Sequence, residues 1–133
     1  MTRINANIDP ATLHRRHLVA ELREITMVPA ALKRALRTKT KDAILASIPE
    51  KFTLGTGHVR FFYDKQEFLR VRFHNLVREM KSRGYSPDVL RSTAFWNFDP
   101  EFRNDWQSSA DDNALVQERI NLRISQKPHL YKD

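Results

Sequence analysis

The stretch Asp64–Gly84, DKQEFLRVRFHNLVREMKSRG, decides the fold, because it carries the clearest helical pattern in the chain. Asp64 and Glu67 have the spacing of a capping box, and Gly84 is typical of the position just after a helix C-terminus. We therefore expect a helix from Asp64 to about Arg83. Its apolar face recurs at helical spacing and consists of Leu69, Phe73, Leu76, Val77 and Met80.

A first helix is predicted upstream, from about Ala11 to Arg37. Asp9 directly precedes Pro10, so Asp can serve as the N-cap while Pro takes the first helical position. Pro29 should kink or break this helix, because a proline ring removes a backbone donor and clashes with the preceding turn. The apolar residues at helical spacing are Leu18, Leu22, Ile25, Leu32 and Leu36.

A third helix is predicted from about Ser109 to Lys127, ending before Pro128. One of its faces is apolar, with Val116, Ile120 and Ile124. A neighbouring stripe at i, i+4 and i+8 should place three cations on a shared face. These cations are Arg119, Arg123 and Lys127.

The segment Ser86–Gln107 between the second and third helices is rich in Pro, Asp and aromatic residues, so we expect a loop. We expect its aromatic side chains to fold back on the core: Phe95, Trp96, Phe98, Phe102 and Trp106. No repeat or long linker divides the chain. The predicted fold is therefore all-α, a single compact domain over residues 1–133 with three main helices and long connecting loops.

Composition narrows the function classes. The 133 residues are 41% hydrophobic, enough for one core, and there is no cysteine, which excludes disulfides and thiolate chemistry. No stretch is apolar enough for a membrane helix, so we expect no membrane partner and a soluble, cytoplasmic monomer. The net charge of +7 favours a polyanionic partner, although a basic but unspecialised surface is the alternative.

The cluster His17, Glu21, Arg23 and Glu24 carries side chains that could do chemistry. His17, Glu21 and Glu24 fall at i, i+4 and i+7, so they share a helix face and could ligate a metal. The alternative is a solvated face with ion pairs. Because the chain has no Glu-x-x-His pair, we expect no metal and no other cofactor.

The N-terminus is a candidate nucleophile. Thr2 is small enough to permit removal of Met1, which would leave an α-amine with a pKa of about 7.7–8.0. A fraction of that amine is neutral at physiological pH and can attack carbon. Arg3 beside it should lower the amine pKa further. Elsewhere, Gly55–His58 indicates a turn but not a phosphate-binding loop, and we expect His58 to be a hydrogen-bonded structural residue.

Several longer motifs occur in one order through nearly the whole chain. They are MTRIN at 1–5, HLVAELRE at 17–24, LGTGHV at 54–59, FFYDK at 61–65, EFLR at 67–70, RG at 83–84, EFR at 101–103 and QKP at 126–128. With these motifs the chain resembles the phage-type pyrimidine-dimer DNA glycosylases with associated lyase activity, also called endonuclease V. The partner implied is double-stranded DNA that contains pyrimidine dimers or abasic sites, acted on in base-excision repair.

The resemblance also implies roles for residues. The α-amine of Thr2 would attack the anomeric carbon of the dimer's 5′ nucleotide, release the base and form an imine, and β-elimination would then cut the strand. Glu24 matches the family's catalytic glutamate, and a carboxylate there would stabilise the positive charge that develops on the sugar. Arg3, His17 and Arg23 match its neighbours. Arginines suit phosphate contacts, and the stripe of Arg119, Arg123 and Lys127 suits sequence-independent backbone binding.

Two departures from the family pattern concern DNA recognition. Met27 stands where the family often has an arginine. The family's C-terminal aromatic run Trp-Tyr-Lys-Tyr-Tyr is reduced here to Leu130–Asp133, LYKD, in which Tyr131 is the candidate for a stacking contact. We expect dimer recognition to be weaker or differently tuned. A metal-dependent nuclease and a non-catalytic DNA-binding module are the alternative functions.

Overall fold

The computed structural model describes residues 3–88 and 90–132. In that part of the chain the secondary structure is helical, and the sole extended pairing is an isolated bridge between Lys65 and Arg103. The all-α prediction is confirmed. The elements are η1 (Pro10–Thr12), α1 (Arg15–Ile25), α2 (Met27–Ala35), α3 (Lys41–Ala46), α4 (His58–Phe61), α5 (Gln66–Ser82), η2 (Leu90–Phe95), η3 (Pro100–Phe102), α6 (Ala110–Gln126) and η4 (Pro128–Tyr131), where η marks a 3-10 helix.

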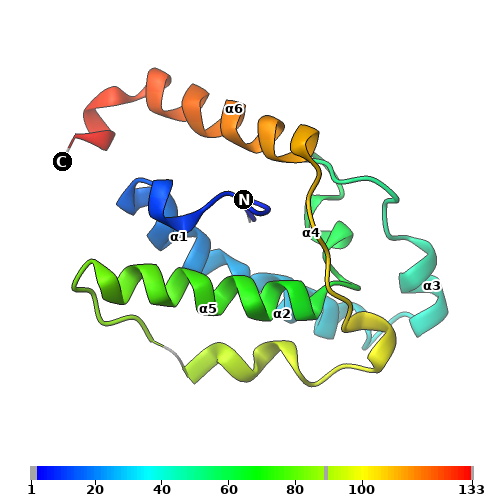
Figure 1. Cartoon of the computed structure of the whole chain (residues 1–133). Helices are drawn as coiled ribbons and strands as arrows, with labels where there is room; N and C mark the ends of the chain where they lie inside the picture. The colour runs from blue at the N-terminus through cyan, green and yellow to red at the C-terminus, as the bar shows by residue number, and fades with distance from the viewer. Residues whose placement is uncertain (1–2, 89, 133) are drawn as a thin grey trace.

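The helices form two levels with the N-terminal segment between them. α1, α2 and α5 lie together on one side, and α6 crosses the opposite side (Figure 1). Residues 3–8 run between α6 and the α1–α5 pair, as their hydrogen bonds to all three helices confirm. Across the described residues, no helix is both long enough and apolar enough to span a bilayer.

The first predicted helix is divided into η1, α1 and α2, so the count of three main helices is not confirmed, whereas the break predicted from Pro29 is present. α1 ends at Ile25, four residues before Pro29. The ring of Pro29 leaves the Ile25 carbonyl without its helical donor, and that is where the helix breaks. Pro29 then sits in the first turn of α2, where no helical donor is needed. Asp9 acts as an N-cap as predicted, but it caps the short η1.

α5 matches the second predicted helix, but the predicted capping box is wrong. No side chain caps its N-terminus. Asp64 instead accepts from Lys65 Nζ at 2.8 Å, and Glu67 binds the guanidinium of Arg70 through two hydrogen bonds of 2.7 Å. A nearby cation therefore draws each carboxylate away from the orphan backbone donors. The predicted apolar face is buried.

The C-terminus of α5 is closed by a Schellman motif at the predicted glycine. Gly84 has φ +91°, a left-handed conformation that costs glycine little. Its N–H donates to the Lys81 carbonyl, and the N–H of Tyr85 donates to the Met80 carbonyl, each at 3.0 Å. The chain therefore reverses sharply after α5.

α6 begins with a full capping box, in which Ser109 and Asp112 bond to each other's backbone N–H. The helix occupies the predicted range within one residue at each end. Just before it, the hydroxyl of Ser108 lies 2.6 Å from Oδ1 of Asn7 and 2.6 Å from Oδ1 of Asn113, and its proton can be donated to either oxygen. Asn7, Ser108 and Asn113 thus form a three-residue cluster. This cluster fastens the N-terminal segment to the start of α6.

The aromatic part of the core lies where α4 and the start of α5 meet the 95–106 segment. Phe52, Phe62 and Phe68 each contact Trp106, with ring centroids 5.0–5.6 Å apart. Four of the five aromatic residues predicted to fold back pack on the core: Phe95, Phe98, Phe102 and Trp106. Trp96 does not, because its side chain is 53% exposed.

A buried ion pair joins α1 to α5. Glu21 and Arg72 are 1% and 4% exposed, and they meet through two hydrogen bonds of 2.8 and 2.9 Å. Asn5 Nδ2 donates to Glu21 Oε1 at 2.8 Å, and Arg72 also donates to the Ile8 carbonyl. The pair therefore holds the N-terminal segment as well as the two helices.

We expect Glu21→Gln to destabilise the protein by about 3–5 kcal/mol, because it leaves the guanidinium of Arg72 buried without its counter-charge. Urea unfolding followed by circular dichroism measures this loss. Glu67→Gln is the matched control, since it breaks the half-exposed pair with Arg70, where a loss of about 0.2–1 kcal/mol is expected. Similar losses in the two variants would contradict the central role of the buried pair.

Candidate active site

A small pocket of about 30 Å³ lies where the N-terminal segment, α1 and α6 meet. Seven of its nine lining residues have polar or charged side chains. Two acidic side chains face three arginines across it, so charges of both signs are held close together. The lining residues are Arg3, Asn5, His17, Ala20, Glu21, Glu24, Arg119, Ile120 and Arg123.

Glu24 is the carboxyl group in this pocket that keeps an open acceptor. Its Oε1 is buried and has no hydrogen-bond partner among the described residues. Burial raises the pKa of Glu24, and the neighbouring carboxylate of Glu21 raises it further, while Arg119 and Arg23 oppose the shift. A carboxyl group with a raised pKa exchanges protons more readily near neutral pH.

Glu21, three residues earlier, is placed very differently. Both of its oxygens already accept hydrogen bonds, from Arg72 and Asn5. The expectation of a solvated helix face is therefore wrong for Glu21, which is a structural residue. Over the part of the chain that the structure describes, no group of three His, Asp or Glu side chains has a metal-binding arrangement.

Three arginines supply the positive charge of the pocket. Arg3 comes from the N-terminal segment, and its buried Nε has no partner among residues 3–88 and 90–132. Arg119 is half-buried and donates to Asn5 Oδ1 at 3.3 Å, and burial lowers its pKa without removing its charge. Arg123 lines the same pocket one turn later on α6.

The predicted stripe on α6 is therefore only partly a shared face. Lys127 is exposed and is not part of the pocket lining. Each step of four residues rotates the side chain by about 40° around the helix axis, so i and i+8 differ by roughly 80°. Arg119 and Arg123 face the pocket, and the third cation lies on the outer surface.

His17 is held by the C-terminal segment. η4 brings Tyr131 onto α1, where its hydroxyl and Nε2 of His17 are hydrogen-bonded at 3.0 Å. The ring of Tyr131 also contacts the His14 ring, with centroids 5.0 Å apart. Burial lowers the pKa of His17, and the charges of His14 and Arg119 lower it further. Tyr131 is thus close to the pocket, and its stacking on a lesion stays a prediction.

Arg23 lies outside the pocket. It is exposed and lines a wider, open groove with Arg15, Arg16 and Tyr85. Met27, the residue that replaces a family arginine, begins α2 and is 45% exposed. Thr2, the predicted nucleophile, lies outside the described residues.

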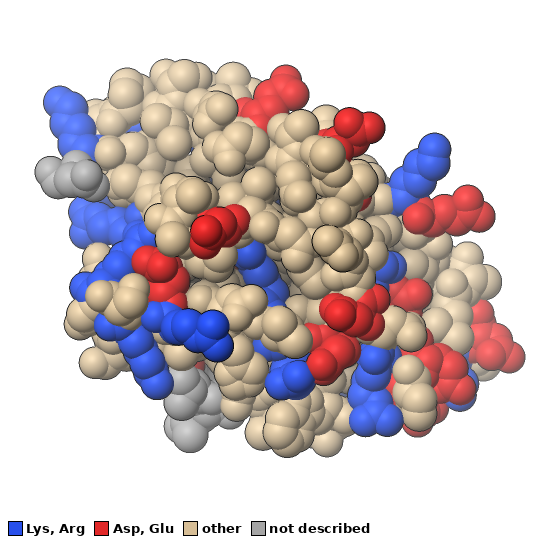
Figure 2. Space-filling view, in the orientation of Figure 1, with Lys and Arg blue, Asp and Glu red and all other residues tan. Residues whose placement is uncertain are grey.

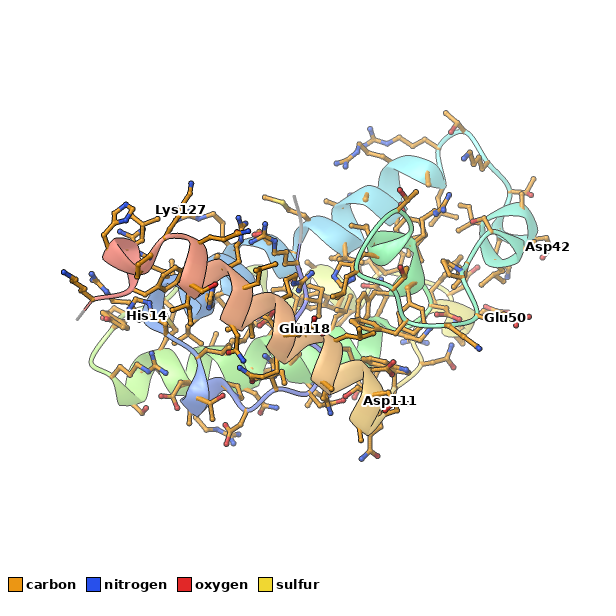
Figure 3. The ribbon with its side chains drawn as sticks, turned by 90° about the horizontal axis from the view of Figure 1, so that it is seen from above. His14, Asp42, Glu50, Asp111, Glu118 and Lys127 are labelled. Carbon is orange, nitrogen blue, oxygen red and sulfur yellow. The ribbon has the colours of Figure 1, made fainter. Side chains whose placement is uncertain are left out.

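On the face seen in Figure 2, basic residues are most frequent at one end of the molecule. Figure 2 shows Lys and Arg side chains clustered where α6 ends and α1 begins, while Asp and Glu are more frequent toward α3. Figure 3 shows the same polarity from above, with His14 and Lys127 at one end and Asp42 and Glu50 at the other. The pocket is thus next to a surface that favours a polyanion.

A basic surface beside the pocket is the electrostatic feature expected of a protein that binds nucleic acid. Residues 1–93 match a family described as pyrimidine dimer DNA glycosylase, and the chain belongs to that family. The resemblance inferred from the sequence motifs is confirmed. The family implies a DNA-repair glycosylase with DNA as its substrate. The matched residues include Arg3, His17 and Glu24, whereas α6 and η4 lie beyond them.

Sequence reasoning missed Asn5 as a pocket residue. Its side chain connects Glu21 on α1 with Arg119 on α6. Nothing in its local sequence indicates this, because its partner Arg119 is 114 residues away. The one sequence feature that contained Asn5 was the family motif at residues 1–5.

We expect part of the acid sensitivity of the fold to come from His17. The folded-state pKa lies below the ordinary value of 6.5, so the unfolded chain binds a proton first as the pH falls. The associated stability is complete above 6.5 and is lost as the pH falls through the folded-state pKa. Urea unfolding between about pH 8 and pH 5 should show a shallower acid loss for His17→Gln than for wild type. Parallel curves would contradict this assignment.

Proposed function

We propose that the protein removes the 5′ base of a cyclobutane pyrimidine dimer and then cuts the strand as an abasic-site lyase. The nucleophile is the α-amine of Thr2, freed by removal of Met1. The observation that carries the proposal is that Arg3, the residue next to Thr2, lines the same pocket as Glu24, whose Oε1 is buried.

The anchoring of the N-terminal segment supports an amine nucleophile. Ile4, Asn5 and Ala6 are buried, and Asn5 is bonded to both α1 and α6. A chain end is ordinarily mobile, so a reactive amine there needs an anchored backbone segment next to it. The buried residues provide one immediately after the proposed nucleophile, which reduces the entropy cost of bringing the amine to a sugar carbon.

The chemistry assigns Glu24 two roles. As the bond between C1′ and the base breaks, the sugar gains positive charge, and a nearby carboxylate stabilises it. The departing nucleobase keeps the electron pair of its bond to C1′ and takes up a proton. The amine nitrogen bonds to C1′ and loses a proton, and the C1′–O4′ bond then breaks, with a proton going to O4′, which gives the protonated imine. In the β-elimination, a base removes a proton from C2′ and the 3′ phosphate leaves with the electron pair of its C–O bond. The raised pKa of Glu24 suits these proton transfers.

The arginines are proposed to hold the DNA backbone. Arg3, Arg119 and Arg123 are at the pocket, where they suit phosphates beside the lesion. Arg23 in the neighbouring groove and Lys127 on the outer surface suit phosphates further away. His17 is proposed to contact the substrate at the pocket, and Tyr131 to stack at its edge.

We expect borohydride to trap a covalent adduct on dimer-containing or abasic DNA without added metal, because an imine is reduced to a stable amine. Mass spectrometry of tryptic peptides should locate the adduct on the peptide that begins at Thr2. Protein that retains Met1 or carries an acetylated Thr2 is the control, and it should give no adduct.

Other outcomes of this assay would favour a different function. An adduct on a lysine peptide would exclude the α-amine as nucleophile. Strand cleavage that a chelator abolishes, without an adduct, would indicate a metal-dependent nuclease. DNA binding with neither adduct nor cleavage would indicate a non-catalytic DNA-binding module.

We expect Glu24→Gln to lower the rate of base release by at least about 100-fold, the usual order for loss of one electrostatic contact to a transition state. Binding of dimer-containing DNA, measured by fluorescence anisotropy, should change little because glutamine keeps the shape. Glu118→Gln on the exposed face of α6 is the matched control and should keep full activity. Equal loss of binding and base release in Glu24→Gln would indicate a structural role.

A further inference from the structure

The imidazole ring of His58 connects two distant parts of the chain. It is 4% exposed and lies at the start of α4. Its Nε2 accepts a hydrogen bond from the backbone N–H of Ile4 at 3.0 Å, and its Nδ1 is 2.8 Å from the Thr53 carbonyl. Ile4 is two residues from Thr2, so the contact holds the backbone of the N-terminal segment close to the proposed nucleophile.

The surrounding residues hold the ring in one place. Phe52 and Phe62 meet it edge-on, with centroids 5.6 and 5.3 Å away. Gly57, with φ +97°, makes the left-handed turn that leads into α4. A Cβ on Gly57 would lie 3.1 Å from Cγ of Pro49, so both the conformation and the space favour glycine. The left-handed turn at Gly57 therefore fixes where the backbone of His58 begins α4.

The two contacts determine which nitrogen carries the proton. A carbonyl oxygen only accepts, so Nδ1 must donate to Thr53, and Nε2 is then the unprotonated acceptor for Ile4. Burial lowers the pKa of His58, which favours this neutral form, and the Thr53 hydrogen bond acts in the opposite direction. The charged groups that act on the ring are Arg119 from α6, which lowers the pKa, and Glu21 from α1, which raises it.

We propose that His58 is a positioning residue, which fixes the reach of the Thr2 amine by accepting the Ile4 N–H through Nε2. This inference rests on the proposed function, because it assigns His58 a part in the amine chemistry. One residue separates Ile4 from Thr2, and consecutive Cα atoms are only about 3.8 Å apart. A shift of the Ile4 backbone therefore passes directly to the nucleophile, and attack is sensitive to displacements of about 1 Å.

Nitrogen-15 NMR of the free protein tests the hydrogen bond itself. The His58 ring should show a protonated Nδ1 and an unprotonated Nε2, with a scalar coupling across the hydrogen bond from Ile4 N to Nε2. A protonated Nε2, or an Ile4 amide that exchanges as fast as an exposed one, would overturn the inference.

Single-turnover trapping on abasic DNA tests the functional consequence. His58→Leu keeps an apolar ring-sized volume but removes the acceptor, so the trapping rate should fall about 10–100-fold, while DNA affinity stays within about threefold. His58→Gln restores an acceptor and should recover most of the rate. Phe52→Leu is the matched control, because it disturbs the same aromatic cluster but leaves the bond to Ile4, and its rate should be unchanged.

A second variant removes the donor instead of the acceptor. Replacing Ile4 by its α-hydroxy acid turns the amide into an ester and leaves His58 intact, so it keeps the test valid if His58→Leu does not fold. The trapping rate should fall as in His58→Leu. If wild-type protein forms the adduct on Thr2 and the ester variant reacts at an unchanged rate, the positioning role of His58 is overturned and the proposed function stands. If wild-type protein forms no adduct on Thr2, the proposed function is overturned as well.

Discussion

The ion pair between Glu21 and Arg72 is the contact on which the rest of the structure depends. A buried carboxylate and guanidinium are tolerated only when their hydrogen bonds are complete, and here the remaining acceptor and donor are satisfied by the N-terminal segment. Completing the pair therefore requires residues 5 and 8 to lie between the helices. The same requirement places Arg3 at the pocket and leaves Asn5 free to hold Arg119.

Two glutamates on one helix illustrate how surroundings divide structural from chemical roles. Glu21 and Glu24 are three residues apart on α1 and line the same pocket. Both oxygens of Glu21 are occupied by hydrogen bonds from Asn5 and Arg72. Glu24 has a buried oxygen without a partner among the described residues and a raised pKa. An acceptor without a partner among the described residues is available to a substrate, and this is why we assign the proposed chemistry to Glu24.

Periodicity and termination signals predicted α5 and α6 because these depend on local contacts. The spacing of apolar residues, Gly84 and Pro128 acts within a few residues along the chain. The break at Thr26 lies near Pro29 as predicted, because a proline disrupts the helical turn that precedes it. The capping box at Asp64 failed because Lys65 and Arg70 compete for the carboxylates.

The sequence predicted several residues of the candidate site but not the contacts between them. The family motifs identified Arg3, His17 and Glu24, and the structure brings these three to one pocket. The roles of Asn5 and Glu21, and the contact of Tyr131 with His17, depend on partners 16 to 114 residues distant. Such pairings arise from the packing of α1 against α5 and α6, which a single sequence does not encode in any local pattern.

The pocket has walls of two different origins. One comes from residues 1–93, which match the family, and the other comes from α6, which lies beyond that match. Ser109 caps α6, whose Val116 and Ile120 are buried in the core, while Arg119 bonds to Asn5 on the first wall. Because α6 contributes Arg119, Ile120 and Arg123 to the lining, a substitution on that helix alters the second wall without changing the side chains of Arg3, His17 and Glu24 that form the first.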